Sequence, residues 1–271
     1  MSTVKQELAK KVENSIEHNT TKLTKNKSIA DLIRMLEPEI KKALPSVITP
    51  ERFTRMALSA LNTTPKLMEC SQMSFLAALM SAAQLGLEPN TSLGQAYLIP
   101  FINKGKLECQ FQIGFKGMID LVYRNSQVQT IQAQCVYEND YFEYELGLNS
   151  KLIHRPALKE RGNLVLVYAL FKLSNGGYGF EVMSKTDLDA HAERYSKGYS
   201  SSYSPWKTNY EEMAKKTVIK KVLKYAPLKT EFVRAMVVDE TIKNSIAEDM
   251  SEVTCEEIVS DSEIETLSSE K

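Results

Sequence analysis

Residues 95–125 read QAYLIPFINKGKLECQFQIGFKGMIDLVYRN, and this stretch decides the fold class. Two runs rich in β-branched and aromatic residues flank the turn at residues 103–106, a pattern that predicts a β-hairpin with a glycine-containing loop. Lys104 and Lys106 place two positive charges at its expected tip, where most lysines are merely solvated. The apolar period then changes, and residues 116–125 predict a short helix.

The segments on both sides of this stretch extend the pattern. Residues 28–88 predict helices, because apolar residues recur at helical spacing, Thr49-Pro50 is a favourable start and Gly86 a favourable stop. Strands are predicted at residues 128–138, 141–146, 164–173 and 178–184, and further helices at 186–195, 205–226 and 231–246. Because the elements come in blocks, we expect an α+β fold with a small, mostly antiparallel sheet packed against flanking helices.

Composition and charge divide the chain into three expected parts. Residues 1–27 are polar and predict a flexible segment, residues 28–246 predict a single α+β domain, and residues 247–271 predict an acidic disordered tail. The formal net charge is zero, but residues 237–271 hold eleven acidic and two basic side chains, which leaves a net charge of +9 on the remainder. A basic body favours a polyanionic partner, and the alternative is an ordinary solvated surface with a solubilising tail.

Absent patterns disfavour several classes of protein. No apolar run approaches the roughly 20 residues that cross a bilayer, and the first residues lack the apolar stretch of a signal peptide, so we expect a cytoplasmic protein without a membrane partner. The four cysteines lie far apart in sequence, which fits neither a disulfide framework nor a zinc site. The phosphate-binding pattern G-x-x-x-x-G-K-[ST] does not occur, so ATP-driven enzymes are disfavoured. We expect no cofactor, no metal and no catalytic residue, and we expect His154 to be a loop residue.

The helix expected over residues 205–226 is the most informative segment. Ser204 can cap it and Pro205 suits its first turn. At 100° per residue one face contains Trp206, Tyr210, Met213, Lys216, Thr217, Lys220 and Lys224. Lys221 borders this face, whereas Lys215 falls on the apolar side, which suggests a snorkelling stem or a specific role.

This mixture of cations and rings suits single-stranded nucleic acid. Lysines neutralise phosphates, and flat rings stack on unpaired bases at ~1–3 kcal/mol each. The alternative is an amphipathic surface helix in which Trp206 is a buried anchor.

A second candidate site lies at the junction between strand and helix. Gly114 and Gly117 allow a tight turn and a close approach of another backbone segment, and free N–H groups at a helix start attract phosphate. The helix that follows places on one face Lys116, Asp120 and Arg124, with Tyr123 beside them. The alternative is a charge ladder at i,i+4 spacing, worth a few tenths of a kcal/mol per pair.

Together these segments resemble the RecT family of phage and prophage single-strand annealing proteins. The resemblance is carried, in order over residues 85–228, by LGLEPN, LGQAYLIPF, CQFQIGFKGMIDLVYRN, VYENDYFEYELG, HRP, SPW and EMAKKTVIKKVLKYAPL. The family usually has tyrosine where this chain has Phe115, and Ser-Gly where it has Asn125-Ser126. The tail matches no pattern of the family.

The resemblance implies a protein that binds single-stranded DNA and anneals complementary strands during homologous recombination, without ATP, in a bacterial host cell. It implies self-assembly into rings or filaments on DNA, a partner exonuclease, and a small sheet packed on helices. The annealed duplex is an expected intermediate, and a host single-strand-binding protein is a candidate partner. By motif position, the expected DNA groove contains Lys116, Arg124, Trp206, Lys207, Lys215, Lys216, Lys220 and Lys221. Side-chain chemistry adds Lys104, Tyr123, Tyr210 and Lys224.

Two other functions are compatible with the residues. One is a metal-dependent nuclease whose carboxylates are Asp140, Glu143, Asp187 and Asp189. The other is a structural assembly protein whose basic face serves only contacts between subunits.

Overall fold

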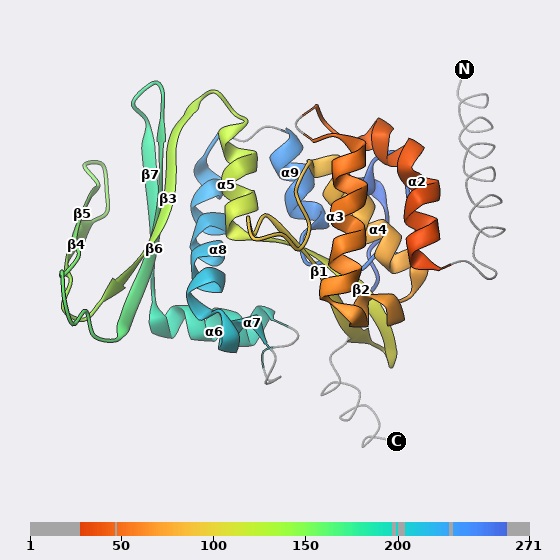
Figure 1. Ribbon diagram of the computed structural model, residues 1–271. Helices are drawn as coiled ribbons and strands as arrows, with labels where there is room; N and C mark the ends of the chain where they lie inside the picture. Colours follow the sequence, from red (N-terminus) through yellow and green to blue (C-terminus); the bar gives the residue numbers. More distant parts are fainter. Residues whose placement is uncertain (1–27, 47, 197–198, 200–203, 228–229, 259–271) are drawn as a thin grey trace.

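The computed structural model describes residues 28–46, 48–196, 199, 204–227 and 230–258. Across the molecule, a three-stranded sheet is followed by a pair of helices and then by a helical block with a hairpin (Figure 1). Side chains from all of these parts join one hydrophobic cluster. The expected α+β class is confirmed. In the part of the chain that the structure describes, every helix is too short or too polar to cross a membrane.

The helical block consists of α2 (Ile29–Ala43), α3 (Pro50–Thr63), the 3-10 helix η1 (Pro65–Glu69) and α4 (Gln72–Leu85). α3 begins as predicted, since the Thr49 side chain accepts a hydrogen bond from the backbone N–H of Arg52 and a proline follows the cap. α4 is apolar and buried along nearly all of its length. Gly86 ends it in the left-handed conformation, with a φ of 58°.

The predicted hairpin is formed by β1 (Ala96–Asn103) and β2 (Lys106–Ile113), which pack on α4. Lys104 and Gly105 at its tip both have positive φ, 49° and 75°, as a two-residue turn of type I′ requires. The hairpin leads into α5 (Phe115–Tyr123), as the change of period indicated.

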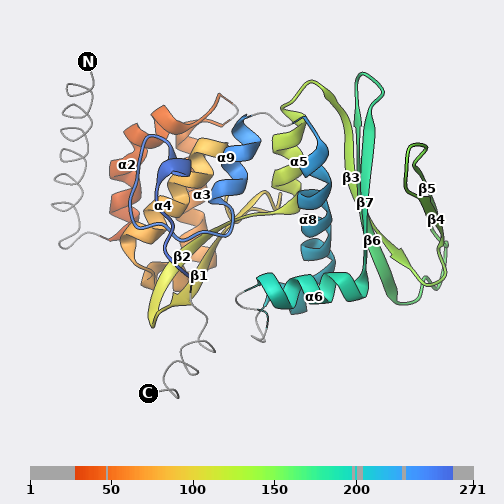
Figure 2. The ribbon, with the colours of Figure 1, turned by 180° about the vertical axis from the view of Figure 1, so that it is seen from behind.

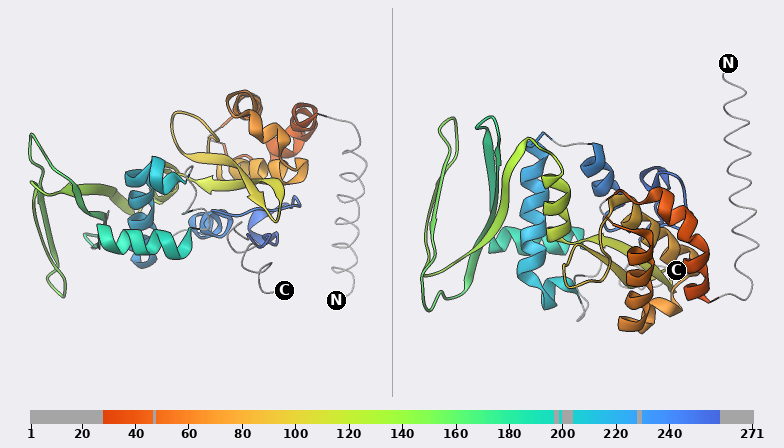
Figure 3. Two further views of the ribbon diagram at one scale, coloured as in Figure 1. Left: turned by 90° about the horizontal axis from the view of Figure 1, so that it is seen from below. Right: turned by 45° about the horizontal axis from the view of Figure 1, so that its top comes forward.

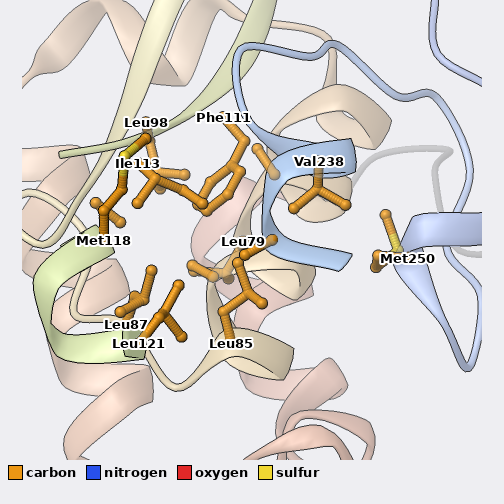
Figure 4. Packing of buried hydrophobic residues seen from close by; sticks show 14 of the residues in the cluster. Leu79, Leu85, Leu87, Leu98, Phe111, Ile113, Met118, Leu121, Val238 and Met250 are labelled. Carbon is orange, nitrogen blue, oxygen red and sulfur yellow. The ribbon is translucent and has the colours of Figure 1, made fainter. Parts of the chain in front are cut away.

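Figure 4 shows the core where these elements meet. Its labelled side chains are Leu79, Leu85, Leu87, Leu98, Phe111, Ile113, Met118, Leu121, Val238 and Met250. They come from α4 and the loop after it, the hairpin, α5, α9 and the segment at Met250, so apolar burial holds these parts together.

The second sheet contains β3 (Val128–Tyr137), β6 (Leu164–Leu173) and β7 (Tyr178–Ser184), antiparallel and in the order β3-β6-β7. The short strands β4 (Tyr141–Glu145) and β5 (Lys151–Arg155) form an arm beyond this sheet (Figure 3). On its other side the sheet packs against α8 (Tyr210–Val222) (Figures 1 and 2).

The arm is held by a buried carboxylate. His154, expected in a loop, lies in β5, with Nε2 3.2 Å from Asp140 Oδ2 and Nδ1 3.3 Å from the Tyr168 hydroxyl. Arg161 donates to both oxygens of Asp140, at 3.0 and 2.5 Å, and holds the pKa of that carboxyl well below its usual range. The strand was missed because five residues beside a proline carry too little alternation to be recognised.

Five helices follow β7: α6 (Lys185–Tyr195), α7 (Pro205–Thr208), α8, the 3-10 helix η2 (Leu223–Tyr225) and α9 (Thr230–Val238), in the part of the chain up to residue 238 that the structure describes. Their bounds differ from the predicted ones in two places. The helix predicted over 205–226 is interrupted at Asn209, whose φ and ψ of −138° and 50° are not helical. The helix predicted over 231–246 ends at Val238, and Glu240 follows with a φ of 62°.

The chain after residue 246 belongs to the folded part up to residue 258, which corrects the tail boundary expected at residue 247. Met250, in the 3-10 helix η3 (Met250–Glu252), is 1 % exposed. Its backbone N–H donates to Gln84 Oε1 at 2.8 Å, and Gln84 Nε2 donates to the carbonyl of residue 248 at 2.9 Å. Acidic composition concealed this anchor. The expected flexible segments 1–27 and 259–271 lie outside the described residues.

The burial of Met250 makes this anchor testable. Replacing Met250 with alanine should lower the free energy of unfolding by about 2–5 kcal/mol, because a buried side chain is truncated and leaves a cavity. The control is Met68→Ala in η1, where the side chain is 55 % exposed and the change should be small. Denaturant unfolding of both variants measures the effect. Equal midpoints for Met250→Ala and Met68→Ala would show that the segment around Met250 does not unfold cooperatively with the rest of the protein.

Candidate nucleic-acid interface

α8 lies between the second sheet and α5 and carries five of the twelve predicted site residues. Its first turn holds Glu211 and Glu212 and its last turn Lys220 and Lys221, which suits the helix dipole. It packs against the second sheet on one side and α5 on another, and the two helices run side by side in Figures 1–3. Consequently few positions on α8 face solvent.

Lys216 is not on an open face. Only 3 % of its side chain is exposed, and its Nζ lies 2.7 Å from Glu240 Oε1 and 3.1 Å from Asp239 Oδ1. The expectation of a solvent-facing row through this lysine is therefore wrong in its geometry. A helical wheel considers one helix alone and does not include the segments that pack against it. Here Asp239 and Glu240, which follow α9, contact Lys216 and Lys220.

Lys220 shares these partners but remains partly accessible. Its side chain is 31 % exposed and pairs with Asp239 and with Glu240, the latter at 3.3 Å. Burial alone would lower the pKa of Lys220, yet the two carboxylates outweigh it and raise the pKa. The same two lysines outweigh the effect of burial on Glu240 and lower its pKa to about 2. Lys220 and Glu240 are therefore both charged at neutral pH.

The remaining predicted lysines of this region are spread around α8 and its ends. Lys215 is 19 % exposed, as expected for the apolar side, and its Nζ is 5.8 Å from the centre of the Phe115 ring of α5. Lys221 lies 3.9 Å from Glu181 of β7. Lys207 in α7 and Lys224 in η2 are exposed. These four cations thus do not share one face.

A buried Trp206 and a partly buried Tyr210 form an aromatic pair at the start of this region. The indole is 5 % exposed, and the two rings meet edge to face with centroids 5.6 Å apart. The Tyr210 hydroxyl donates to Asp189 of α6 at 2.6 Å, and burial together with this bond raises the pKa of Tyr210. The geometry corresponds to the alternative in which Trp206 is a core anchor.

The junction of β2 and α5 has the close backbone approach that its glycines predict. A methyl group on Gly114 would collide with the carbonyl oxygen of Gly94, and one on Gly117 with that of Gln95. The Gly114 N–H donates to the Gln95 carbonyl at 2.9 Å. The loop before β1 is thereby pressed against the start of α5.

An exposed cation and an exposed ring gather at this corner. Lys116, in the first turn of α5, is exposed, and its stem lies beside Gly94. The Tyr97 side chain, 40 % exposed, lies against both Gly94 and Gly114. Burial and the nearby Glu212 raise the pKa of Tyr97, so its hydroxyl is neutral at neutral pH. Sequence reasoning missed Tyr97 because strand alternation alone does not show that its ring faces the glycine corner.

Two predicted residues at the other end of α5 have protein partners. Arg124 donates to the carbonyls of Leu85 at 2.6 Å and Gly86 at 3.1 Å, and to Asp120 at 2.7 Å. It therefore accounts for two C-terminal carbonyls of α4, and with Asp120 it forms one of the two pairs of the charge ladder that was the alternative interpretation. Tyr123 is 47 % exposed, and its hydroxyl accepts a hydrogen bond from the Ile131 N–H at 3.2 Å.

The hairpin tip is remote from these helices. Lys104 lies at the opposite end of β2 from α5, roughly 23 Å along an eight-residue strand. Its Nζ is 3.4 Å from Glu257 of the acidic C-terminal segment. The structure therefore brings together the predicted residues of α5 and α8 but leaves Lys104 apart.

The carboxylates of the nuclease alternative are dispersed. Asp140 is buried under the arm, Glu143 accepts a hydrogen bond from Tyr141, and Asp189 pairs with Lys185. Asp187 forms a capping box with Ser184 at the start of α6. Among the described residues, no three His, Cys, Asp or Glu side chains are arranged to hold a metal ion.

Comparison with known proteins identifies the family. The model of the RecT family matches residues 51–254. The chain is 40 % identical to Protein RecT of Escherichia coli (strain K12) over 222 residues, which is 80 % of this chain and 81 % of that protein. It is 29 % identical to the uncharacterized protein YqaK of Bacillus subtilis (strain 168) over 241 residues, 86 % of this chain and 81 % of the relative. This chain belongs to the RecT family.

Proposed function

We propose that this protein binds single-stranded DNA and anneals complementary strands in homologous recombination without hydrolysing ATP, and that it is not an enzyme. The proposal rests on the family, within which this activity is expected, and on the corner at the start of α5. There Lys116, the N-terminus of a nine-residue helix and the exposed ring of Tyr97 lie together. A cation and helix N–H groups suit a phosphate, and a ring suits an unpaired base.

The corner extends along the α5 and α8 pair. Lys215 lies near the start of α5, and Lys220, Lys221 and Lys224 follow toward the far ends of the two helices. We place the strand along this pair, within one α+β unit of residues 28–258. Annealing makes and breaks no covalent bond. The physical task is to hold one strand with its base edges accessible and to screen the phosphates of the second.

We further propose that the protein works in the bacterial cytoplasm as an oligomer on DNA, on strands exposed by a partner exonuclease. A host single-strand-binding protein is a further candidate partner. The arm formed by β4 and β5 supports self-association, since Leu146 and Leu148 at its turn are 69 % and 104 % exposed. Sedimentation with an oligonucleotide should show species larger than a monomer. A monomer at every protein concentration would contradict this part of the proposal.

Annealing should need no nucleotide. Two complementary oligonucleotides, one labelled with a donor dye and one with an acceptor, should pair faster when the protein is present and ATP is absent. The physical reason is that charge screening and strand alignment draw only on binding energy. Stopped-flow fluorescence measures the rate, and acceleration that appears only after ATP is added would contradict the proposal.

Lys116 and Tyr97 should contribute in different ways. Lys116→Ala should make the slope of log K against log salt shallower by roughly 0.7, the single-strand value for one phosphate contact. Tyr97→Ala should weaken binding by ~1–3 kcal/mol with little change of slope, because stacking releases few ions. Fluorescence anisotropy across a salt series separates the two effects.

The control for both variants is Tyr178→Ala, at a ring that is 56 % exposed in β7 and lies off the path that we propose for the strand. Thermal melting must show that all three variants fold. Unchanged affinity and slope for both Lys116→Ala and Tyr97→Ala would remove the α5 corner from the interface.

A further inference from the structure

Two lysines of the proposed interface are already paired with an internal acidic dipeptide. Asp239 and Glu240 follow α9 directly, and their carboxylates meet Lys216 and Lys220 of α8. Two positive and two negative charges cancel at this point of the DNA-binding face that we propose. The two carboxylates differ, however, in how firmly they are held.

Asp239 is a fixed part of the fold. Its side chain has no exposed surface, and its Oδ1 accepts a hydrogen bond from the Ile113 N–H at 2.7 Å as well as one from Lys216 at 3.1 Å. It thereby joins the end of β2 to α8. Removing it would take from Lys216 its fully buried carboxylate and from the Ile113 N–H its acceptor, so it cannot be exchanged for a ligand without disturbing the fold.

Glu240 is held in a different way. Its side chain is 42 % exposed and its φ is 62°, a left-handed conformation that is unfavourable for a residue with a Cβ. Its neighbours hold the backbone there: Gln110 Nε2 donates to the Glu240 carbonyl at 3.1 Å, and the Phe111 N–H donates to that of Thr241 at 3.0 Å. These bonds hold an accessible carboxylate between two lysines, with Oε1 2.7 Å from Lys216 Nζ and 3.3 Å from Lys220 Nζ.

Lys220 is the lysine of this cluster that a polyanion can reach. Its side chain is 31 % exposed, against 3 % for Lys216. A carboxylate oxygen and a phosphate oxygen make the same kind of charge-assisted hydrogen bond to an ammonium group. A phosphate that reaches Lys220 therefore finds the ammonium group already paired with another oxyanion, the Glu240 carboxylate.

We propose that Glu240 is a built-in competitor of the DNA phosphate: it pairs with Lys220 in the free protein and is displaced when a strand binds. This inference rests on the proposed function, since it names how one contact of that interface is regulated. Lys216 also contacts Glu240, at 2.7 Å, and keeps its bond to Asp239 when Glu240 leaves, so the connection between β2 and α8 remains. Because the pKa of Glu240 lies at about 2, the exchange is one of ion partners and needs no protonation at neutral pH.

The test compares Glu240→Gln with the wild-type full-length chain. Anisotropy of a labelled oligonucleotide is measured across a potassium chloride series. The variant should bind about fivefold more tightly at 0.1 M salt, with a slope of log K against log salt steeper by roughly 0.7, as one additional single-strand phosphate contact predicts. Glu240→Asn should act in the same direction, because asparagine tolerates positive φ and also removes the charge.

Two controls separate competition from a general change of charge. Glu51→Gln removes one exposed carboxylate from α3 and should change neither affinity nor slope. In a Lys220→Gln background, Glu240→Gln should give no gain. Thermal melting is recorded for every variant. If Lys220→Gln does not fold, the test is the slope of log K against log salt: it should be steeper for the Glu240 variants than for Glu51→Gln.

The outcomes are distinct. Wild-type binding together with folded Glu240 variants of unchanged or weaker affinity would overturn this inference alone. A gain of equal size without Lys220 would also overturn it, because the effect would then be one of general charge. A wild-type protein that binds no oligonucleotide would overturn the proposed function, and this inference with it.

Discussion

Asp239 carries a charge without any exposed surface, and this constraint determines how the two halves of the molecule meet. A buried carboxylate is tolerated only when donors surround it, because an unpaired one would cost several kcal/mol. Here the donors are the Ile113 N–H and two lysines of α8. The end of β2, the middle of α8 and the end of α9 must therefore come to one point. The hairpin half is thus tied to the helix that supports the second sheet.

The contacts of Asp239 show that the lysines of α8 are not all available to a ligand. Lys216 and Lys220 have the spacing of a phosphate-binding row, but Lys216 is a buried structural cation and Lys220 pairs with Glu240. Arg124 at the end of α5 also has a structural role, since its guanidinium donates hydrogen bonds to two carbonyl groups at the end of α4. Lys216 and Arg124 thus serve packing, and the accessible cations of this helix pair lie at the ends of α5 and α8.

The sequence predicted best those features that depend on neighbouring residues. Helix starts and stops at Thr49 and Gly86, the hairpin turn and the tight approach at Gly114 and Gly117 follow from local backbone preferences, and all of them are present. The side on which a lysine is buried could not be predicted in this way. It depends on Asp239, more than twenty positions along the chain from Lys216, and spacing within one helix carries no information about that partner.

The other misses have the same origin. β5 became a strand through pairing with β4 and through the bond between His154 and Asp140, both of which are contacts between segments. Met250 is anchored by Gln84, 166 residues away in sequence, so an acidic composition wrongly suggested a tail at that point. Tyr97 is a candidate for base stacking because its side chain packs against Gly94 and Gly114 at the start of α5, which is again a contact between segments. Tertiary contacts overrode composition in each case.

An annealing protein faces a requirement that a simple binder does not. It must hold a strand strongly enough to align it, yet each contact must be weak enough that a mismatched pairing can separate and try again. A surface of free lysines would serve the first need at the expense of the second, because every phosphate contact adds to the affinity and slows release. In the interface that we propose, a cation with a carboxylate neighbour, such as Lys220 with Glu240, gains less free energy from a phosphate than an unpaired cation would. Many contacts of this weaker kind would align a strand and still let a mismatched pairing separate, which is what reversible alignment of two strands requires.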